Sequence, residues 1–211
     1  MGQEAHLHIE RHEVLTPDGW VLELSRVRVG RTAGAPVLLV PGFGMNGWIF
    51  RYHPRGPSLM ESLARAGLDP WSVELRGSSP TRRHPGTRAR VSLSRMALVD
   101  LPAAFDAVAA HTGYARVHAI GCRLGGALLY GYGAAAVQHR IDRLVAMGSP
   151  FRWDDVGGVV RAFAGAASLA RLRPRGSRAA ARWALPWVGR LAPSLLSIYL
   201  NPRITDTRDA A

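Results

Sequence analysis

The sequence predicts an α/β fold with a doubly wound, mostly parallel sheet. Short aliphatic runs alternate with longer helical patterns over the first 150 residues, and strands that alternate with helices form βαβ units with right-handed crossovers. A turn signal near the N-terminus adds an antiparallel hairpin in front of them. The chain has 211 residues, 47% of them hydrophobic and 20% charged, so it can bury a sizeable core.

The hairpin is predicted from residues 16–19, whose sequence Thr-Pro-Asp-Gly is typical of a turn. This turn separates residues 12–15 from residues 20–29, where apolar side chains alternate as in a half-buried strand. The apolar positions then change parity at Val27, and this change predicts a bulge or a bend.

The elements that follow alternate in type. Residues 35–40 are an aliphatic run that ends in Pro-Gly, which is typical of a strand buried on both faces. A helix in which Leu98, Leu101 and Phe105 recur at helical spacing is predicted after the fourth strand. The full set of later elements is helices at 58–66, 96–111 and 124–137, and strands at 70–75, 116–120 and 141–147.

From residue 151 the pattern changes to segments rich in Ala, Arg and Leu that are broken by Gly and Pro. We therefore expect a core domain at residues 13–150 and an incomplete helical cap at residues 151–211. No apolar run is long and unbroken enough to span a bilayer. The polar start of the chain is unlike a signal peptide, and a single cysteine permits a reducing compartment, so we expect a cytoplasmic location.

The charge of the chain is strongly positive, with a net value of +12, and all 27 basic residues are arginine. The absence of lysine, together with many Ala and Gly residues, is typical of a protein from a GC-rich genome rather than of phosphate recognition. No nucleic-acid partner is therefore expected. Residues 150–211 hold half of the excess, which is typical of contact with an anionic lipid surface through the cap. A second cluster of arginines lies in a predicted loop that contains no acidic residue. We interpret it as a solvated loop, and the alternative is that it attracts an anionic head group. Its members are Arg76, Arg82, Arg83, Arg88, Arg90 and Arg95.

The most informative segment is residues 121–125, whose sequence is Gly-Cys-Arg-Leu-Gly. A strand runs into a helix through a turn with Gly121 and Gly125 on its two sides, which is the shape of the nucleophile elbow G-x-S-x-G. Glycine avoids Cβ clashes in such a tight turn. The helix N-terminus beneath the turn offers backbone N–H groups to an anion.

With this segment the chain resembles the first two-thirds of an α/β-hydrolase of the esterase/lipase type, with some similarity to polyhydroxyalkanoate synthases. The resemblance covers roughly residues 13–150. Its parts stand in the family's order: a hairpin at 16–20, an oxyanion loop at 40–44 with Pro where His is common, an Arg-Gly turn at 74–79, the elbow at 121–126, and 147–150 after the sixth strand. It implies an α/β-hydrolase fold that is truncated after the sixth strand, and an acyl ester or a carboxylate as the small-molecule partner.

The resemblance also assigns the candidate site residues. It implies an oxyanion hole formed by the backbone N–H groups of Phe43 and Leu124, and it puts Arg123 at the position of the nucleophile. Arginine has no nucleophilic atom and stays charged. Cys122 is the alternative nucleophile, but it lies one residue before the apex, where a small buried cysteine is more typical of core packing.

The family's acid and base follow the nucleophile along the chain. No histidine follows His139 here, and Asp154 and Asp155 are better interpreted as helix N-cap residues than as a catalytic acid. The eight histidines show no metal-ligand spacing, so neither a metal nor another cofactor is expected. Three interpretations stay open, of which the first is favoured: an inactive relative (a pseudoenzyme), a protein that binds a carboxylate or phosphate through Arg123, and an esterase or acyltransferase that uses Cys122.

Overall fold

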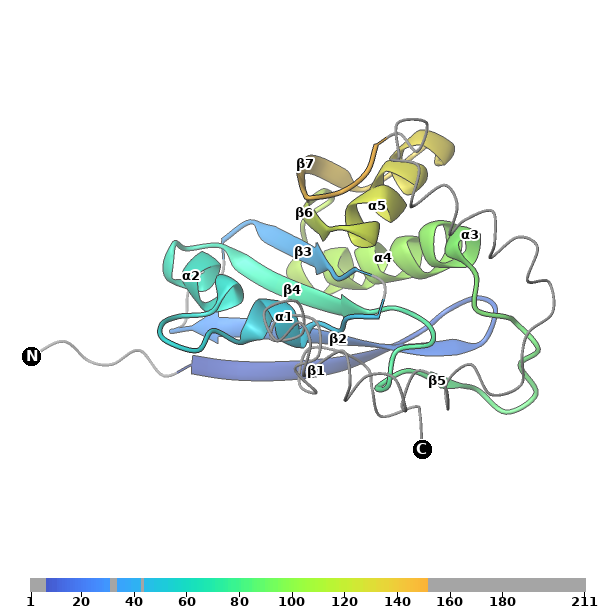
Figure 1. Cartoon of the computed structure of the whole chain (residues 1–211), viewed down its shortest axis with the longest axis horizontal. Coiled ribbons are helices and arrows are strands. Elements are labelled where there is room, and N and C mark those ends of the chain that lie inside the picture. Colours follow the sequence, from blue (N-terminus) through green and yellow to red (C-terminus); the bar gives the residue numbers. More distant parts are fainter. Residues whose placement is uncertain (1–6, 31–33, 43, 152–211) are drawn as a thin grey trace, which may run out of the picture. The chain divides into compact units, whose positions relative to one another are not determined.

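The computed structural model describes residues 7–30, 34–42 and 44–151 of the chain. In them seven strands form one sheet in the order β1-β2-β4-β3-β6-β7, with β5 paired to β2 (Figure 1). The strands are β1 (Leu7–Leu15), β2 (Trp20–Val29), β3 (Pro36–Val40), β4 (Asp69–Glu74), β5 (Arg82–Arg83), β6 (Val117–Cys122) and β7 (Ile141–Met147). The pairs among β4, β3, β6 and β7 are parallel and those of β2 are antiparallel, which confirms the predicted mixed sheet with its N-terminal hairpin.

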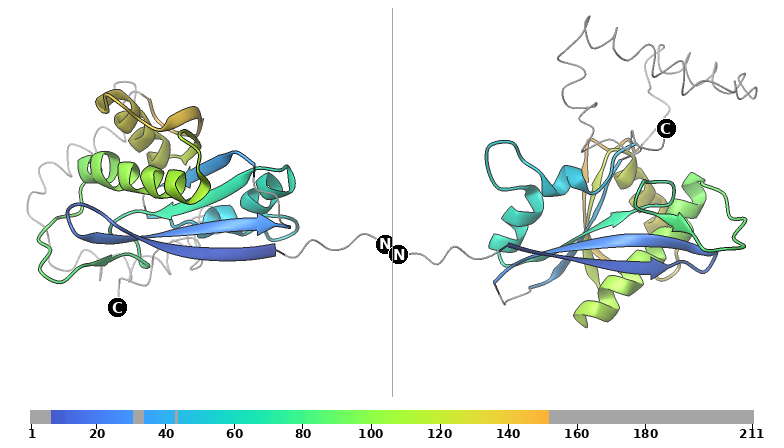
Figure 2. Two further views of the ribbon diagram at one scale, coloured as in Figure 1. Left: turned by 180° about the vertical axis from the view of Figure 1, so that it is seen from behind. Right: turned by 90° about the horizontal axis from the view of Figure 1, so that it is seen from below.

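Helices cover both faces of this sheet (Figure 2). The helices are α1 (Trp48–Arg51), α2 (Leu59–Arg65), α3 (Leu93–Arg95), the π-helical turn η1 (Met96–Asp100), α4 (Leu101–Thr112) and α5 (Leu124–Ala135). The larger hydrophobic cluster joins β2, β3, β4 and β6 to α4 and α5, and a smaller one joins Val27 and the strand β3 to α1 and α2. The two clusters bury the central parallel strands β3 and β4 along their whole length, as expected for parallel strands.

Of the bulge or bend predicted at Val27, the bulge is absent. The register with β1 is continuous from Leu7 opposite Val29 to Leu15 opposite Val21. The parity changes because the two ends of β2 are buried on different faces: Leu22 and Leu24 belong to the larger cluster, whereas Val27 packs in the smaller one with Phe50 and Met60. Because both faces of the strand are covered, apolar side chains at odd and at even positions can be buried without a bend.

The predicted helix at 96–111 begins with a π-helical turn, and this changes which side chains face the core. In η1 the side chain of Leu98 is 48% exposed, whereas Asp100 is completely buried. A π turn inserts an extra residue, so Leu98 no longer shares a face with Leu101 and Phe105. The helix then continues as α4 and ends at Gly113, whose φ of +77° provides a left-handed C-cap.

The buried Asp100 lies in an ion-pair network with Arg76, which follows β4. The Nε and Nη2 atoms of Arg76 donate to the carboxylate of Asp100 at 2.6–3.0 Å, and Nη1 and Nη2 donate to Asp18 at 2.8 and 2.9 Å. Hydrogen bonds from Arg76 hold the pKa of Asp18 well below its usual range. The network ties the hairpin turn to the end of β4 and to η1.

The prediction that the arginines of this loop are all solvated is therefore wrong in part. Arg76 is interior, Arg95 pairs with Asp18 at 2.7 Å, Arg82 pairs with Glu13 at 2.6 Å, and Arg83 lies over the ring of Trp20. The acids lie in the hairpin, more than 60 residues earlier in sequence than Arg82 and Arg95. Only the sheet topology brings these acids beside the arginines.

A pair of histidines joins β1 to α4. The rings of His12 and His111 are 4.4 Å apart, and both contact Trp71. Burial, and then the nearby His12 and Arg26, lower the pKa of His111, while Glu10 opposes this. The folded state thus favours neutral His111, and stability is full above the unfolded pKa of about 6.5 and falls as the pH drops through it.

We expect this loss to stay below about 1 kcal/mol, because His111 is exposed and solvent screens its charge. Urea midpoints at pH 7.5 and 5.5 measure it for the parent and for His111→Gln. The decrease toward pH 5.5 should be smaller in the variant. An equal decrease in both proteins would assign the pH dependence to other groups.

Candidate active site

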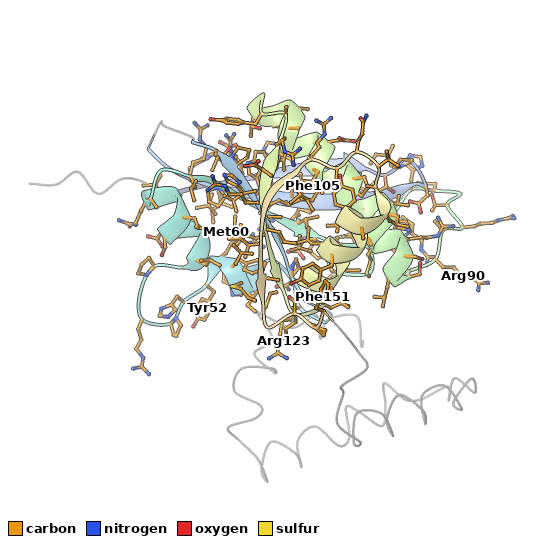
Figure 3. All side chains as sticks on the ribbon, turned by 90° about the horizontal axis from the view of Figure 1, so that it is seen from above. Tyr52, Met60, Arg90, Phe105, Arg123 and Phe151 are labelled. Atoms are coloured by element: carbon orange, nitrogen blue, oxygen red, sulfur yellow. The ribbon has the colours of Figure 1, made fainter. Side chains whose placement is uncertain are left out.

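The candidate site is the turn between β6 and α5, which consists of the single residue Arg123. Its φ of +52° and ψ of −117° make it the one non-glycine residue with positive φ in the described part of the chain. Its N–H donates to the carbonyl of Met147 at 2.9 Å. Residues in such sparsely populated conformations cost about 1–3 kcal/mol and persist only where their surroundings fix them. The exposed side chain points outward from the turn (Figure 3).

The surroundings that fix the turn are backbone atoms at very short range. A Cβ added at Gly121 would lie 2.4 Å from the Cα of Gly126, and one added at Gly125 would lie 2.2 Å from the carbonyl oxygen of Val40. Both positions that the sequence analysis singled out thus have no room for a side chain. They let α5 approach β6 and β3 closely enough to form the sharp turn.

Gly126 is a further required glycine that the sequence analysis missed. A Cβ there would lie 2.0 Å from the hydroxyl oxygen of Ser149, a residue that follows β7. In the sequence, the only indication of this requirement is the pair Gly125-Gly126 at the start of the helix. Its meaning depends on Ser149, which is 23 positions later in sequence and adjacent only in the fold.

The predicted oxyanion loop meets the elbow. Phe43, one of the two predicted donors, lies outside the described residues. Its neighbour Gly42 lies so near the turn that an added Cβ would be 3.2 Å from the carbonyl oxygen of Cys122 and 3.3 Å from the Cβ of Arg123. Leu124, the other predicted donor, is the first residue of α5. Gly42, Arg123 and Leu124 are therefore together at the carboxyl edge of the sheet, and the oxyanion role of Phe43 and Leu124 stays a prediction.

A buried carboxylate secures the far end of that loop, which the sequence analysis did not identify. Glu74, at the end of β4, accepts a hydrogen bond from the backbone N–H of Gly47 at 2.7 Å and faces Arg51 at 3.6 Å. A Cβ at Gly47 would lie 2.8 Å from the Glu74 carboxylate and 2.7 Å from the hydroxyl of Ser72. These contacts fix the start of α1 and therefore the connection from β3 to it.

Cys122 lies in β6 opposite Met147, where its side chain is half-buried and packs against the smaller hydrophobic cluster. Burial raises the pKa of the Cys122 thiol, and the nearby charge of Arg123 offsets part of this. The thiol is thus protonated near pH 7, whereas the thiolate is the reactive species.

Other kinds of site have less support. Within residues 7–30, 34–42 and 44–151, no group of three or more His, Cys, Asp or Glu side chains is arranged to hold a metal ion. No helix of the described part is both long and apolar enough to cross a membrane. Asp154 and Asp155, weighed above as acids, lie outside the described residues, as does the predicted cap from residue 152 onward.

Comparison with known proteins identifies the family. The model of the alpha/beta hydrolase fold family matches residues 35–168, so the chain belongs to that family. Triacylglycerol lipase 2 of Arabidopsis thaliana is 35% identical over 158 residues, which cover 67% of this chain and 37% of the lipase. Gastric triacylglycerol lipase of Homo sapiens is 32% identical, over 53% of this chain and 31% of the lipase. The chain thus spans about a third of the length of these relatives.

Solved structures agree on the fold. Epoxide hydrolase CorEH superimposes with a TM-score of 0.62 at 16% identity, over 96% of this chain and 67% of that protein. Epoxide hydrolase VrEH1 from Vigna radiata gives 0.61 at 18% identity, over 90% and 57%. At these identities the similarity shows the α/β-hydrolase fold and nothing about the substrate. The lipase relatives confirm the predicted relationship to the esterase/lipase type.

Proposed function

We propose that this chain is a lipase- or esterase-type α/β-hydrolase relative that does not hydrolyse acyl esters by itself. One observation carries the proposal: Arg123 occupies the strained turn where the family's fold presents its nucleophile. A guanidinium has no nucleophilic atom and is not deprotonated in proteins. The elbow therefore keeps its shape, supported by Gly121 and Gly125, and lacks the atom that begins acyl transfer.

The raised pKa of Cys122 argues against a thiol replacement. A catalytic cysteine needs a depressed pKa and an accessible sulfur, whereas this side chain is half-buried against hydrophobic residues and its pKa is shifted upward. Its position in β6, one residue before the apex, directs it along the sheet face with the residues of the smaller cluster.

Hydrolysis of p-nitrophenyl butyrate tests the proposal. We expect no turnover above the buffer blank, both for the parent chain and for Arg123→Ser. A serine at the apex would also need a base and an orienting acid. The last histidine of the sequence, His139, precedes β7 and therefore lies at the opposite end of the parallel strands from the elbow. Steady turnover by the parent chain would contradict the proposal, and the same assay on Cys122→Ala would then show whether the thiol is responsible.

The second candidate is the binding of an acyl carboxylate, and the position of Arg123 favours it. The residue lies at the N-terminus of the 12-residue helix α5, where the helix dipole disfavours a cation by about 0.3–1 kcal/mol. A carboxylate there would offset this cost through charge-assisted hydrogen bonds. Calorimetric titration with octanoate should therefore give weaker binding to Arg123→Ser than to the parent, and equal affinities would remove this candidate.

A further inference from the structure

The segment at residues 88–98, between β5 and α4, exposes an unusual combination of side chains. Val91, Leu93 and Leu98 are 45%, 50% and 48% exposed. Single exposed apolar side chains are ordinary on protein surfaces. Three such side chains within eight residues of one anchored segment are more than a single scattered one, and larger exposed apolar areas mark interaction sites.

The exposed charged side chains of this segment are arginines, of which Arg95 is paired with Asp18 at 2.7 Å. Arg88 and Arg90 are exposed, and neither forms an ion pair with an acid of the described residues. Glu74 and Asp100 are the nearest acids before and after the segment in the sequence, and both are buried. Figure 3 shows the side chain of Arg90 extending away from the body of the protein. The segment therefore carries two exposed cations, Arg88 and Arg90, close in sequence to its exposed apolar side chains.

The backbone of the segment is held in place from beneath. The carbonyl of Ala89 accepts from the indole N–H of Trp20 at 3.0 Å, and that of Arg90 accepts from the buried Arg76 at 3.4 Å. The hydroxyl of Ser92, the N-cap of α3, accepts from the N–H of Arg95. The surface is thus preformed, and little ordering is needed when a partner binds.

We propose that residues 88–98 are a docking surface for an anionic lipid membrane. Lipid phosphates would meet Arg88 and Arg90, while Val91, Leu93 and Leu98 would enter the region of the acyl chains. Arginine suits this arrangement because its aliphatic stem packs on apolar surface while its guanidinium stays in the head-group layer. A nucleic acid would satisfy the cations alone and leave the apolar side chains in water. The proposal is independent of acyl hydrolysis and of the carboxylate candidate.

Sedimentation of the full chain with vesicles tests it. We expect binding to vesicles of phosphatidylglycerol and phosphatidylcholine in 0.1 M salt, and much weaker binding to phosphatidylcholine alone. Each arginine near an anionic surface contributes roughly fivefold to binding, so Arg88→Gln with Arg90→Gln should weaken it about 25-fold. Val91→Ser with Leu93→Ser should weaken it by about tenfold.

A control variant, Val137→Ser with Arg143→Gln, removes one exposed apolar side chain and one exposed charge elsewhere on the surface. The control should bind vesicles like the parent, and thermal midpoints should show that all variants are folded. Unchanged binding of either loop variant would overturn the proposal. A purely electrostatic surface would also overturn it. In that case the arginine variant loses vesicle binding, a short DNA duplex competes with the vesicles, and the apolar variant still binds.

Discussion

Gly125→Ala is expected to destabilise the chain by more than about 3 kcal/mol, at the upper limit for overpacking. The new methyl group would lie 2.2 Å from the carbonyl oxygen of Val40 and 2.6 Å from that of Pro41. These are backbone atoms of the end of β3 and of the residue after it, so they cannot move aside as a flexible side chain can. The helix α5 would have to shift away from the sheet. Urea unfolding measures the loss, and the extreme result is an absence of folded protein.

Gly131→Ala is the matched control for this prediction because it makes the same change in the same helix. Its added methyl group would lie 3.8 Å from the Cβ of Ala97, which is an ordinary contact. Alanine in a helix interior is favoured over glycine by about 0.5–1 kcal/mol, so this variant should be at least as stable as the parent. Similar effects of the two substitutions would contradict the elbow packing described for Gly125.

Asp100→Ala is expected to cost about 3–5 kcal/mol, which is typical of the removal of one partner from a buried ion pair. Asp100 accepts hydrogen bonds from the side chain of Arg76 and from its backbone N–H at 3.0 Å, and both side chains are completely buried. The substitution leaves the Arg76 guanidinium inside the protein with Asp18 as its remaining carboxylate partner among the described residues. Chemical denaturation at pH 7 measures the loss.

An exposed ion pair on the same stretch of helix provides the comparison. Asp106 in α4 pairs with Arg140, and their side chains are 63% and 42% exposed. Asp106→Ala should therefore change stability by less than about 1 kcal/mol. A loss as large as that of Asp100→Ala would mean that burial does not determine the energy of these pairs.

The sheet and most helices were predictable because their signals are local. The hairpin turn, the aliphatic run of β3 and the terminal glycine of α4 each follow from a few neighbouring residues. The errors occur where a distant contact decides the outcome. The bulge predicted at Val27 fails because a second cluster buries the other face of β2, and Leu98 is exposed because η1 turns Asp100 inward to Arg76.

The candidate site divides in the same way. The pattern at residues 121–125 predicts a turn that the structure shows in detail, with Arg123 at positive φ. Its supports come from far along the chain: Ser149 packs against Gly126, and Glu74 holds Gly47 at the end of the loop from β3. No local pattern pairs these residues, because the sheet topology brings them together. Phe43 lies outside the described residues, so its predicted donor role rests on the resemblance alone.

The central claim is that the elbow of this chain holds no nucleophile that an ester substrate can acylate. Intact-protein mass spectrometry after incubation with p-nitrophenyl butyrate tests this claim most directly. An active nucleophile would retain the butyryl group as a covalent intermediate. We expect the mass of the parent chain to remain unchanged at pH 7, because Arg123 cannot be acylated and the pKa of Cys122 is raised. A stoichiometric butyryl adduct that maps to Cys122 and is absent from Cys122→Ala would contradict the account.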